Sequence, residues 1–451
     1  MSLSLIISCY KVKSNQSMFI TFKFEEIEKL LESANLNFLI GSGASRPFLD
    51  TLQDIEKAME SFDRKDGFGN DQTNQETLKI IEASIKNHYF TKCIEKNLKL
   101  ISAKFCNEKE PCDKDLNKCK VAHEYKIFLE SLQTILSKRS NNYPKQVNLF
   151  TTNIDVFLDV ALEECRLSFN DGFSGRMNPK FGTENFHNIV NKVSSHYDYQ
   201  STLPLFNLFK LHGSLNWKWS EDKTNIYYDN QLSAVEKLKG CNLAKESLVE
   251  CFDENGKFLS KKDNKDHGFS AIYEEATKIK NSDSKIKEFI EAYDKLVMIN
   301  PNKDKFKDTT LKLHYYELLR MFSNNIDKEN SVLFVFGFSF ADEHICEIVN
   351  RAVKSNPTLL VVIFAYSENT EKRMREEKET RDLINTHNVV FVARFTKEEK
   401  GNRKPINIFD LETINKEFFE KIANSLGKSK DGRHVVNVVV QDKKEVEKDA
   451  K

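Results

Sequence analysis

The sequence has no net charge, because 68 lysines and arginines are balanced by 68 aspartates and glutamates over 451 residues. A global electrostatic field that would attract nucleic acid or a membrane surface is therefore absent. This argues against a general DNA-binding protein and leaves only a local basic patch open. Long apolar runs are missing as well: the longest, residues 332–338 and 359–366, are far shorter than the ~20 residues that a membrane-spanning helix needs.

Paired cysteines are also missing. The chain has nine cysteines, an odd number, and no C-x-x-C pair, which argues against a disulfide framework or a zinc ribbon. Only Cys106, Cys112, Cys119 and His123 crowd together, and their spacings match no common zinc pattern. We therefore predict no metal site. The first ten residues lack the basic start and the cleavage site of a signal peptide, so we expect a reduced, cytoplasmic protein.

Two common phosphate-binding fingerprints are absent, since the chain contains neither a G-x-G-x-x-G run nor a Walker A motif. A glycine-rich loop, G-S-G-A-S-R-P at residues 41–47, nevertheless follows a short apolar strand. Gly41 and Gly43 can adopt backbone angles that let the chain approach a ligand closely. Such a loop can present free N–H groups to a phosphate. A plain turn is the alternative interpretation.

The chain does contain a regular alternation of apolar strands and amphipathic helices. Strands are predicted at residues 37–40, 147–150, 205–211, 331–338, 359–366 and 388–395. Helices are predicted at residues 24–36, 124–136, 156–164, 311–322, 371–386 and 412–426, with another from about 342. This order indicates an α/β fold with a doubly wound, mostly parallel, Rossmann-like sheet.

The predicted domain organisation is one large domain with additions. Residues 1–23 form an N-terminal extension, and residues 24–427 form the domain, with helical insertions at about 52–140 and 231–294. The first insertion contains no pattern typical of a catalytic or binding site. The second is expected to be a helical lobe. Residues 428–451 form a charged tail with an apolar run at 435–440, which would be an aggregation hazard as a free edge. It either pairs with the chain's own sheet or, as our hypothesis, adds a strand to a partner or neighbouring subunit.

The most informative stretch runs from Asn148 to Glu164. A short strand is followed by the polar turn Thr151–Asp155 and then by a helix from about Val156. In open α/β sheets, ligands bind at the carboxyl ends of strands, where such turns lie. Thr152, Asn153 or Asp155 could instead simply cap the helix.

A second polar turn follows the strand at residues 205–211 and begins with His212, Gly213 and Ser214. This histidine follows its strand just as the Asn153 turn follows the strand before it, which makes His212 a candidate acid–base group. Gly213 allows a tight backbone approach, and Trp217 and Trp219 are expected to form flat walls that exclude water. The segments at 216–220 and 225–229 are predicted to be two strands of a hairpin.

Three motifs thus stand in a fixed order: G-S-G-A-S, T-T-N-I-D and L-H-G-S. Over roughly residues 25–400 the chain resembles the sirtuin family, in which a G-A-G-x-S loop, a T-Q-N-I-D turn and an H-G pair surround NAD. The run G-F-S-F-A-D-E-H at 337–344 stands where sirtuins have a G-T-S turn. The residues of these motifs are more similar to those of the sirtuin-like NADases of bacterial antiphage defence. Residues 299–306 and 315–320 resemble the branch encoded beside a HerA-type ATPase.

The resemblance implies a role for each site residue. Asn153 would orient the ribose and a water, His212 would accept a proton, and Asp155 would contact the nicotinamide amide or favour the cationic sugar. The expected NAD-binding positions are Gly41, Ser42, Gly43, Ala44, Ser45, Thr152, Gly213, Gly337 and Ser339. Asp342 and Glu343 are expected to matter less, as charges that complement the start of a helix.

The implied activity is NAD+ hydrolysis in antiphage defence, by a homo-oligomer that works with a hexameric HerA-type ATPase and meets nucleic acid only through that partner. Sirtuin deacylases carry a four-cysteine zinc module and continue the glycine loop as G-I-P-D-F-R, whereas this chain has neither. Both departures affect the parts that shape the acyl-lysine groove. An NAD-dependent protein deacylase and a non-catalytic module that binds NAD or ADP-ribose are the alternatives.

Overall fold

Seven parallel strands of the described chain form the centre of the molecule. Their order across the sheet is β15 (Val389–Val392), β14 (Leu360–Phe364), β13 (Ser331–Phe336), β3 (Asn35–Ile40), β4 (Gln146–Thr151), β10 (Leu205–Lys210) and β5 (Phe169–Asn170). The computed structural model describes residues 2–10, 17–23, 30–50, 53–64, 75–101, 115–259, 268–279, 284–301, 313–377, 380, 383, 386–392, 395–399, 402–426 and 435–436. The sheet confirms the predicted doubly wound α/β fold.

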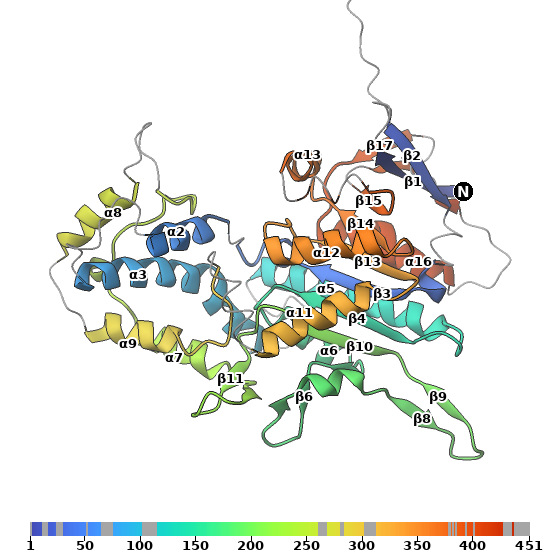
Figure 1. The fold of residues 1–451 in the computed structure, drawn as a ribbon, viewed down its shortest axis with the longest axis horizontal. Coiled ribbons are helices and arrows are strands. Elements are labelled where there is room, and N and C mark those ends of the chain that lie inside the picture. Colours follow the sequence, from blue (N-terminus) through green and yellow to red (C-terminus); the bar gives the residue numbers. More distant parts are fainter. Residues whose placement is uncertain are drawn as a thin grey trace, which may run out of the picture.

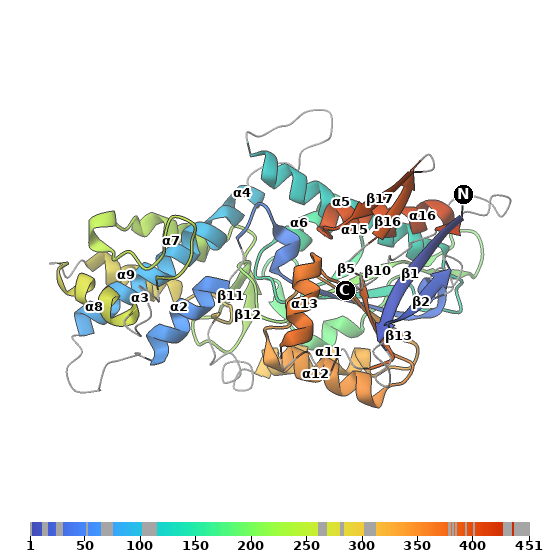
Figure 2. The same cartoon turned by 90° about the horizontal axis from the view of Figure 1, so that it is seen from above.

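Helices cover both faces of this sheet, as Figures 1 and 2 show. Along β13, Val332, Phe334 and Phe336 belong to one buried cluster and Leu333 and Val335 to another. This alternation follows from the two-residue period of a strand. The first cluster is completed by α5 (Leu116–Lys138), α6 (Phe157–Glu164) and the continuous helical run α15 (Leu411–Ile414), η6 (Asn415–Phe419) and α16 (Glu420–Leu426). The second is completed by α11 (Leu313–Ile326), α12 (Glu343–Ser355) and α13 (Glu368–Glu376).

The predicted strands and helices lie close to the observed ones, with differences at their ends. The first helix is seen at residues 30–33, and residues 24–29 lie outside the described residues. Strand β13 ends at Phe336, two residues before the prediction, because Gly337 has a φ of 65° and leaves the extended conformation. Helix α13 runs from Glu368 to Glu376, earlier than the predicted 371–386.

A row of asparagines crosses four neighbouring strands. Asn37, Asn148, Asn207 and Asn170 are paired in register. Each amide donates to the next, with N–O distances of 2.8 Å from Asn148 to Asn37, 3.0 Å from Asn207 to Asn148 and 3.2 Å from Asn170 to Asn207. Asn148 also donates to Asn325 of α11. Because a shift of one residue would break these bonds, the row fixes the register of the four strands.

The two predicted helical insertions join into a single lobe beside the sheet (Figures 1 and 2). The lobe consists of α2 (Gln53–Arg64), α3 (Gln75–Tyr89), α7 (Ser233–Cys241), α8 (Gly268–Thr277) and α9 (Ser284–Tyr293). Edge-to-face contacts such as Phe90 with Phe289, at 6.1 Å between ring centroids, link the two sequence segments. The segments η2 (Phe90–Ile94), η3 (Glu95–Asn97) and α4 (Leu98–Ile101) connect the lobe to the sheet. Helix α5, by contrast, packs on the sheet.

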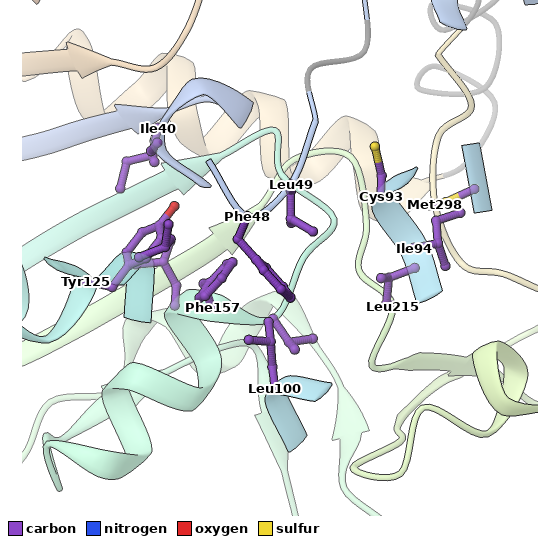
Figure 3. Close-up of a cluster of buried hydrophobic side chains, with 14 of the residues drawn as sticks. Ile40, Phe48, Leu49, Cys93, Ile94, Leu100, Tyr125, Phe157, Leu215 and Met298 are labelled. Carbon is purple, nitrogen blue, oxygen red and sulfur yellow. The ribbon is translucent and has the colours of Figure 1, made fainter. Parts of the chain in front are cut away.

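Side chains from the sheet and the lobe connector meet in one apolar cluster, drawn in Figure 3. Phe157 is stacked on Tyr125 at 5.3 Å between centroids and meets Phe48 edge to face at 5.7 Å. Phe48 follows the glycine loop, and Phe157 follows the Thr151–Asp155 turn. The cluster therefore holds these two predicted site segments against each other.

Smaller strands surround the main sheet. Strands β11 (Trp217–Trp219) and β12 (Ile226–Tyr228) form the predicted hairpin, and β7 (Lys180–Phe181) and β6 (Phe173–Ser174) extend it. Two further hairpins are β8 (Asn191–Val193) with β9 (Gln200–Thr202), and β16 (Phe395–Glu399) with β17 (Asn402–Ile406). Trp217 packs on Phe173 and Phe181, and Trp219 lies against His314. The expectation that both tryptophans wall the site is wrong, because this aromatic cluster holds them elsewhere.

The two ends of the chain add strands to the main sheet. Strand β1 (Ser2–Tyr10) pairs antiparallel with β15 and with β2 (Ser17–Lys23). Strand β18 (Val435–Val436) pairs in parallel with Ser2 and Leu3 of the same chain. These two residues of the tail thus pair with the chain's own sheet, as the alternative to our partner hypothesis had it. Residues 437–440 lie outside the described residues.

None of the helices in the described part of the chain is both long and apolar enough to cross a membrane. In the same part, no three His, Cys, Asp or Glu side chains gather where they could hold a metal ion. Cys106 and Cys112 lie outside it. Cys119 is disulfide-bonded, so the expectation of reduced cysteines is wrong for this residue. Cys93, Cys165, Cys241, Cys251 and Cys346 are in the reduced state.

Candidate active site

A cavity of about 380 Å³ lies at the carboxyl ends of the central strands. Loops that follow β3, β4, β10, β13 and β14 contribute to its wall. The predicted site residues that line it are Ser42, Gly43, Ala44, Ser45, Thr152, Asn153, Asp155, His212, Gly337 and Ser339. Gly41 and Gly213 are absent from its lining. Side chains far apart in the sequence thus meet in one pocket of the size that small ligands occupy.

Asn153 is held in the turn after β4 with one side-chain atom left unpaired. Its main-chain N–H donates to Thr151 Oγ1 at 3.0 Å, and its Nδ2 donates to the Gly41 carbonyl at 3.2 Å and to Ser45 Oγ at 3.4 Å. Asn153 Oδ1 accepts no hydrogen bond from any described residue, although the residue is only 6% exposed. A buried, unpaired acceptor in a cavity wall is costly unless a ligand pairs with it.

Asp155 is buried beneath the glycine loop. Its Oδ2 accepts a 2.8 Å hydrogen bond from Ser45 Oγ, and its Oδ1 accepts one from the main-chain N–H of Phe157 at 3.2 Å. Ser45 Oγ also lies 3.1 Å from Tyr125 OH. Burial raises the pKa of Asp155, and the Lys210 cation opposes that rise. Both carboxylate oxygens and the Ser45 hydroxyl are thus engaged in holding the loop.

The glycine loop is held by hydrogen bonds from its own main-chain N–H groups. The N–H groups of Gly41, Gly43 and Ala44 donate to the carbonyls of Phe336, Gly337 and Gly41. The expectation of free N–H groups is therefore wrong for these three residues. A Cβ at Gly43 would lie 2.9 Å from Gly337 Cα, and one at Gly337 would lie 2.5 Å from Ala44 N. The glycines are needed because the loops after β3 and β13 touch through their backbones.

His212 follows β10 and reaches the loop after β13. Its Nε2 lies 3.1 Å from Asp342 Oδ2, and its main-chain carbonyl accepts from Ile299 N at 2.9 Å. Asp342 is the N-cap of α12, since its Oδ1 accepts from Ile345 N at 3.2 Å. Asp342 stands at the start of α12, as predicted, and the same carboxylate also contacts the candidate base. Gly213 has a φ of 79° and pairs with Met298, which explains its need for glycine.

A buried lysine joins the two turns. Lys210 Nζ donates to the Asp155 carbonyl at 2.5 Å and lies 2.7 Å from Asp159 Oδ2. Asp159 Oδ1 accepts from Asn216 Nδ2 at 3.0 Å. The side chains of Lys210 and Asp159 are 2% and 7% exposed, so this is a desolvated ion pair with further hydrogen bonds.

Several cavity residues were missed by the sequence reasoning. Glu56, Tyr89, Cys93 and Asn97 come from the lobe and its connector, in the segment where no chemistry was predicted. Asn97 Oδ1 accepts from Val156 N at 3.1 Å, and burial raises the pKa of the Cys93 thiol to about 12. Further wall residues missed in this way include Tyr366, Thr370, Arg373, Glu377 and Asp410. No local sequence signal marks these residues, because each becomes a neighbour only through the tertiary fold.

A Rossmann-like α/β sheet with a cavity at the carboxyl ends of its strands defines the class of protein. Within this class, a family model described as a SIR2-like domain matches residues 147–392, just over half of the chain. The chain therefore belongs to the SIR2-like family, whose members are typically NAD-dependent enzymes. This confirms the resemblance to sirtuins at the level of the family. No curated protein matches the chain in sequence.

Proposed function

We propose that this chain is an NAD+ glycohydrolase, which cleaves NAD+ with water to nicotinamide and ADP-ribose. The observation that carries the proposal is that Asn153 and His212, from adjacent parallel strands, line one cavity with the loops after β3 and β13. The unpaired Oδ1 of the buried Asn153 marks the place where a polar ligand group would bind.

The chemistry of the reaction fits these side chains. Nicotinamide leaves a cationic ring as a neutral molecule, so its departure needs no general acid. The barrier lies in the oxocarbenium-like ribose, as in glycoside cleavage. The protein has to hold the ribose, stabilise positive charge and place a water near the anomeric carbon. Asn153 Oδ1 can accept from a ribose hydroxyl or from that water, and His212 can accept the water's proton.

The positions of the strands suggest how NAD+ would lie. Asn153 and His212 follow β4 and β10, whereas Gly337, Ser339 and Tyr366 follow β13 and β14 on the other side of β3. We place the nicotinamide ribose at the first pair and the adenosine near the second group. Asp155 contributes by holding Ser45 and the turn.

We extend the proposal to the setting that the sequence resemblance implies. The enzyme would act in the cytoplasm as a homo-oligomer with a hexameric HerA-type ATPase, and would deplete NAD+ when phage infection is sensed. Unregulated cleavage would kill the host, so the proposal includes a resting state and a trigger.

The test incubates the purified full-length chain with NAD+, with and without a co-expressed HerA-type ATPase, and identifies the products by mass spectrometry. Nicotinamide and ADP-ribose are expected from water and NAD+ alone. Asn153→Ala and His212→Ala should abolish cleavage while the protein stays folded. The matched controls Asn142→Ala and His196→Ala, at exposed positions, should retain it.

Each other outcome points to a different function. Nicotinamide release that requires an acylated peptide would identify a deacylase. Saturable NAD+ binding without turnover, with the two site variants changing affinity only, would identify a binding module. Full turnover in both site variants would refute the roles of Asn153 and His212.

A further inference from the structure

The carboxylate of Asp342 contacts both the start of α12 and the candidate base, His212. One oxygen accepts from Ile345 N at the start of α12, and the other lies 3.1 Å from His212 Nε2. The side chains of Asp342 and His212 are 8% and 13% exposed. The cap fixes the carboxylate relative to α12, so its second oxygen offers a rigid acceptor to the imidazole.

A carboxylate beside one ring nitrogen determines which tautomer a neutral histidine adopts. Asp342 Oδ2 can only accept, so Nε2 carries the proton and Nδ1 carries the lone pair. A base whose proton-accepting nitrogen is fixed in this way is ready for general base catalysis. The same carboxylate stabilises the imidazolium that forms once a proton has been taken.

We propose that Asp342 is the positioning residue of the site, which holds His212 as its Nε2–H tautomer and supports its protonated form. This inference rests on the proposed function for its effect on rate, but the tautomer itself can be measured independently. In the proposed reaction the C1′–N bond breaks and its electron pair goes to the nicotinamide nitrogen. The water oxygen bonds to C1′, and the water's proton goes to His212 Nδ1. Asp342 touches neither NAD+ nor water in this scheme.

The decisive variant is Asp342→Asn. Asparagine is a good N-cap, so its oxygen can keep the bond to Ile345 N and α12 should remain intact. Its NH2 group would then face His212 and donate to Nε2, which moves the ring proton to Nδ1. We expect kcat for NAD+ cleavage to fall at least ~100-fold, within the range of a lost general base, with the Kd for NAD+ changed less than about threefold. The matched control Glu343→Gln, exposed on the first turn of α12, should leave kcat unchanged.

The tautomer is read by 15N NMR of protein labelled at histidine, with the His212 signals assigned by their loss in His212→Ala. Wild type should show a protonated Nε2 and a bare Nδ1, and Asp342→Asn should show the reverse. An unchanged tautomer, or an unchanged or higher kcat in Asp342→Asn, would overturn the positioning role. If wild type does not cleave NAD+ but the tautomer reverses as expected, the proposed function fails and the positioning of His212 stands.

Discussion

Lys210 Nζ lies 2.5 Å from the main-chain oxygen of Asp155 and 2.7 Å from Asp159 Oδ2. Lys210 is the last residue of β10 and stands two residues before His212, whereas Asp155 stands two residues after Asn153. One buried cation therefore ties the turn that carries Asn153 to the strand that carries His212. The relative position of the two candidate catalytic groups depends on this contact.

Replacement of Lys210 by methionine should damage both stability and activity. It leaves the buried Asp159 without its cation, which typically costs about 3–5 kcal/mol of unfolding free energy. It also frees the Asp155 carbonyl, so NAD+ cleavage should fall as well. Urea denaturation of Lys210→Met beside the exposed control Lys218→Met measures the first effect. A double variant, Lys210→Met with Asp159→Leu, should recover part of the lost stability; no recovery would contradict the ion-pair explanation.

Gly337→Ala should destabilise the protein by roughly 2–4 kcal/mol, since the residue has a φ of 65° and its Cβ would lie 2.5 Å from Ala44 N. The loops after β3 and β13 would have to separate, and the cavity between them would lose its shape. Gly240→Ala is the matched control, because a Cβ there meets no described atom within 4 Å and the residue lies in α7. That variant should gain about 0.5–1 kcal/mol. Thermal unfolding of the two variants should therefore shift in opposite directions.

Asp171 should make stability fall as the pH rises. Burial raises its pKa from the usual 3.8 to about 6. Between these two values the folded state holds a proton that the unfolded state has lost, so each rise in pH disfavours folding. Asp171→Asn can still accept from Phe173 N and has no charge to bury. It should unfold like wild type near pH 4 and be more stable above pH 6, by on the order of 1–3 kcal/mol.

The control for this titration is the exposed Asp222, whose pKa is lowered to about 2 by hydrogen bonds from Ser220 and Thr224. Its contribution is lost only as the pH falls from 3.8 towards that value. The difference between wild type and Asp222→Asn should therefore stay constant from pH 4.5 to 7. A difference for Asp171→Asn that is equally flat would show that Asp171 ionises normally.

Asn148 should be the most sensitive member of the asparagine row. It donates to Asn37 and Asn325 and accepts from Asn207. Asn148→Val would leave polar atoms of all three without that partner, at a cost of about 2–4 kcal/mol. Replacing Asn37, Asn148 and Asn207 together by apolar residues should cost less than the single change. Only Asn325 and Asn170 then lose a partner from the row, and each keeps another, with Lys328 and the Asn188 carbonyl. Urea midpoints of the single and triple variants test this order.

The sequence predicted the sheet because its strands are short apolar runs that alternate with amphipathic helices. It predicted the placement of Asn153 and His212 because parallel strands bring their carboxyl ends to one edge. It could not predict the contact of Asp342 with His212, since helix-capping residues look the same whether or not a histidine lies opposite. The contact of Gly41 and Gly43 with Gly337 could not be predicted either. A glycine-rich sequence looks the same whether its loop packs against another loop or binds a phosphate.

The sequence predicted helices in the two insertions but not their packing against each other, for the same reason. Amphipathic periodicity shows that a helix has a buried face and does not show what covers it. Helices α3 and α9 pack against each other although they lie far apart in the sequence. Trp217 was misplaced in a similar way, since its proximity in sequence to His212 says nothing about the direction of the ring.

The cavity wall has two origins. Asn153, His212 and Asp342 fall within the segment that matches the SIR2-like family, whereas the loop at 42–46, Tyr89 and Asp410 fall outside it. The candidate catalytic groups thus lie in the matched segment, whereas part of the enclosure around them lies outside it. Substitutions at residues 42–46, Tyr89 or Asp410 would therefore reshape the opening of the pocket without altering the segment that the family model covers.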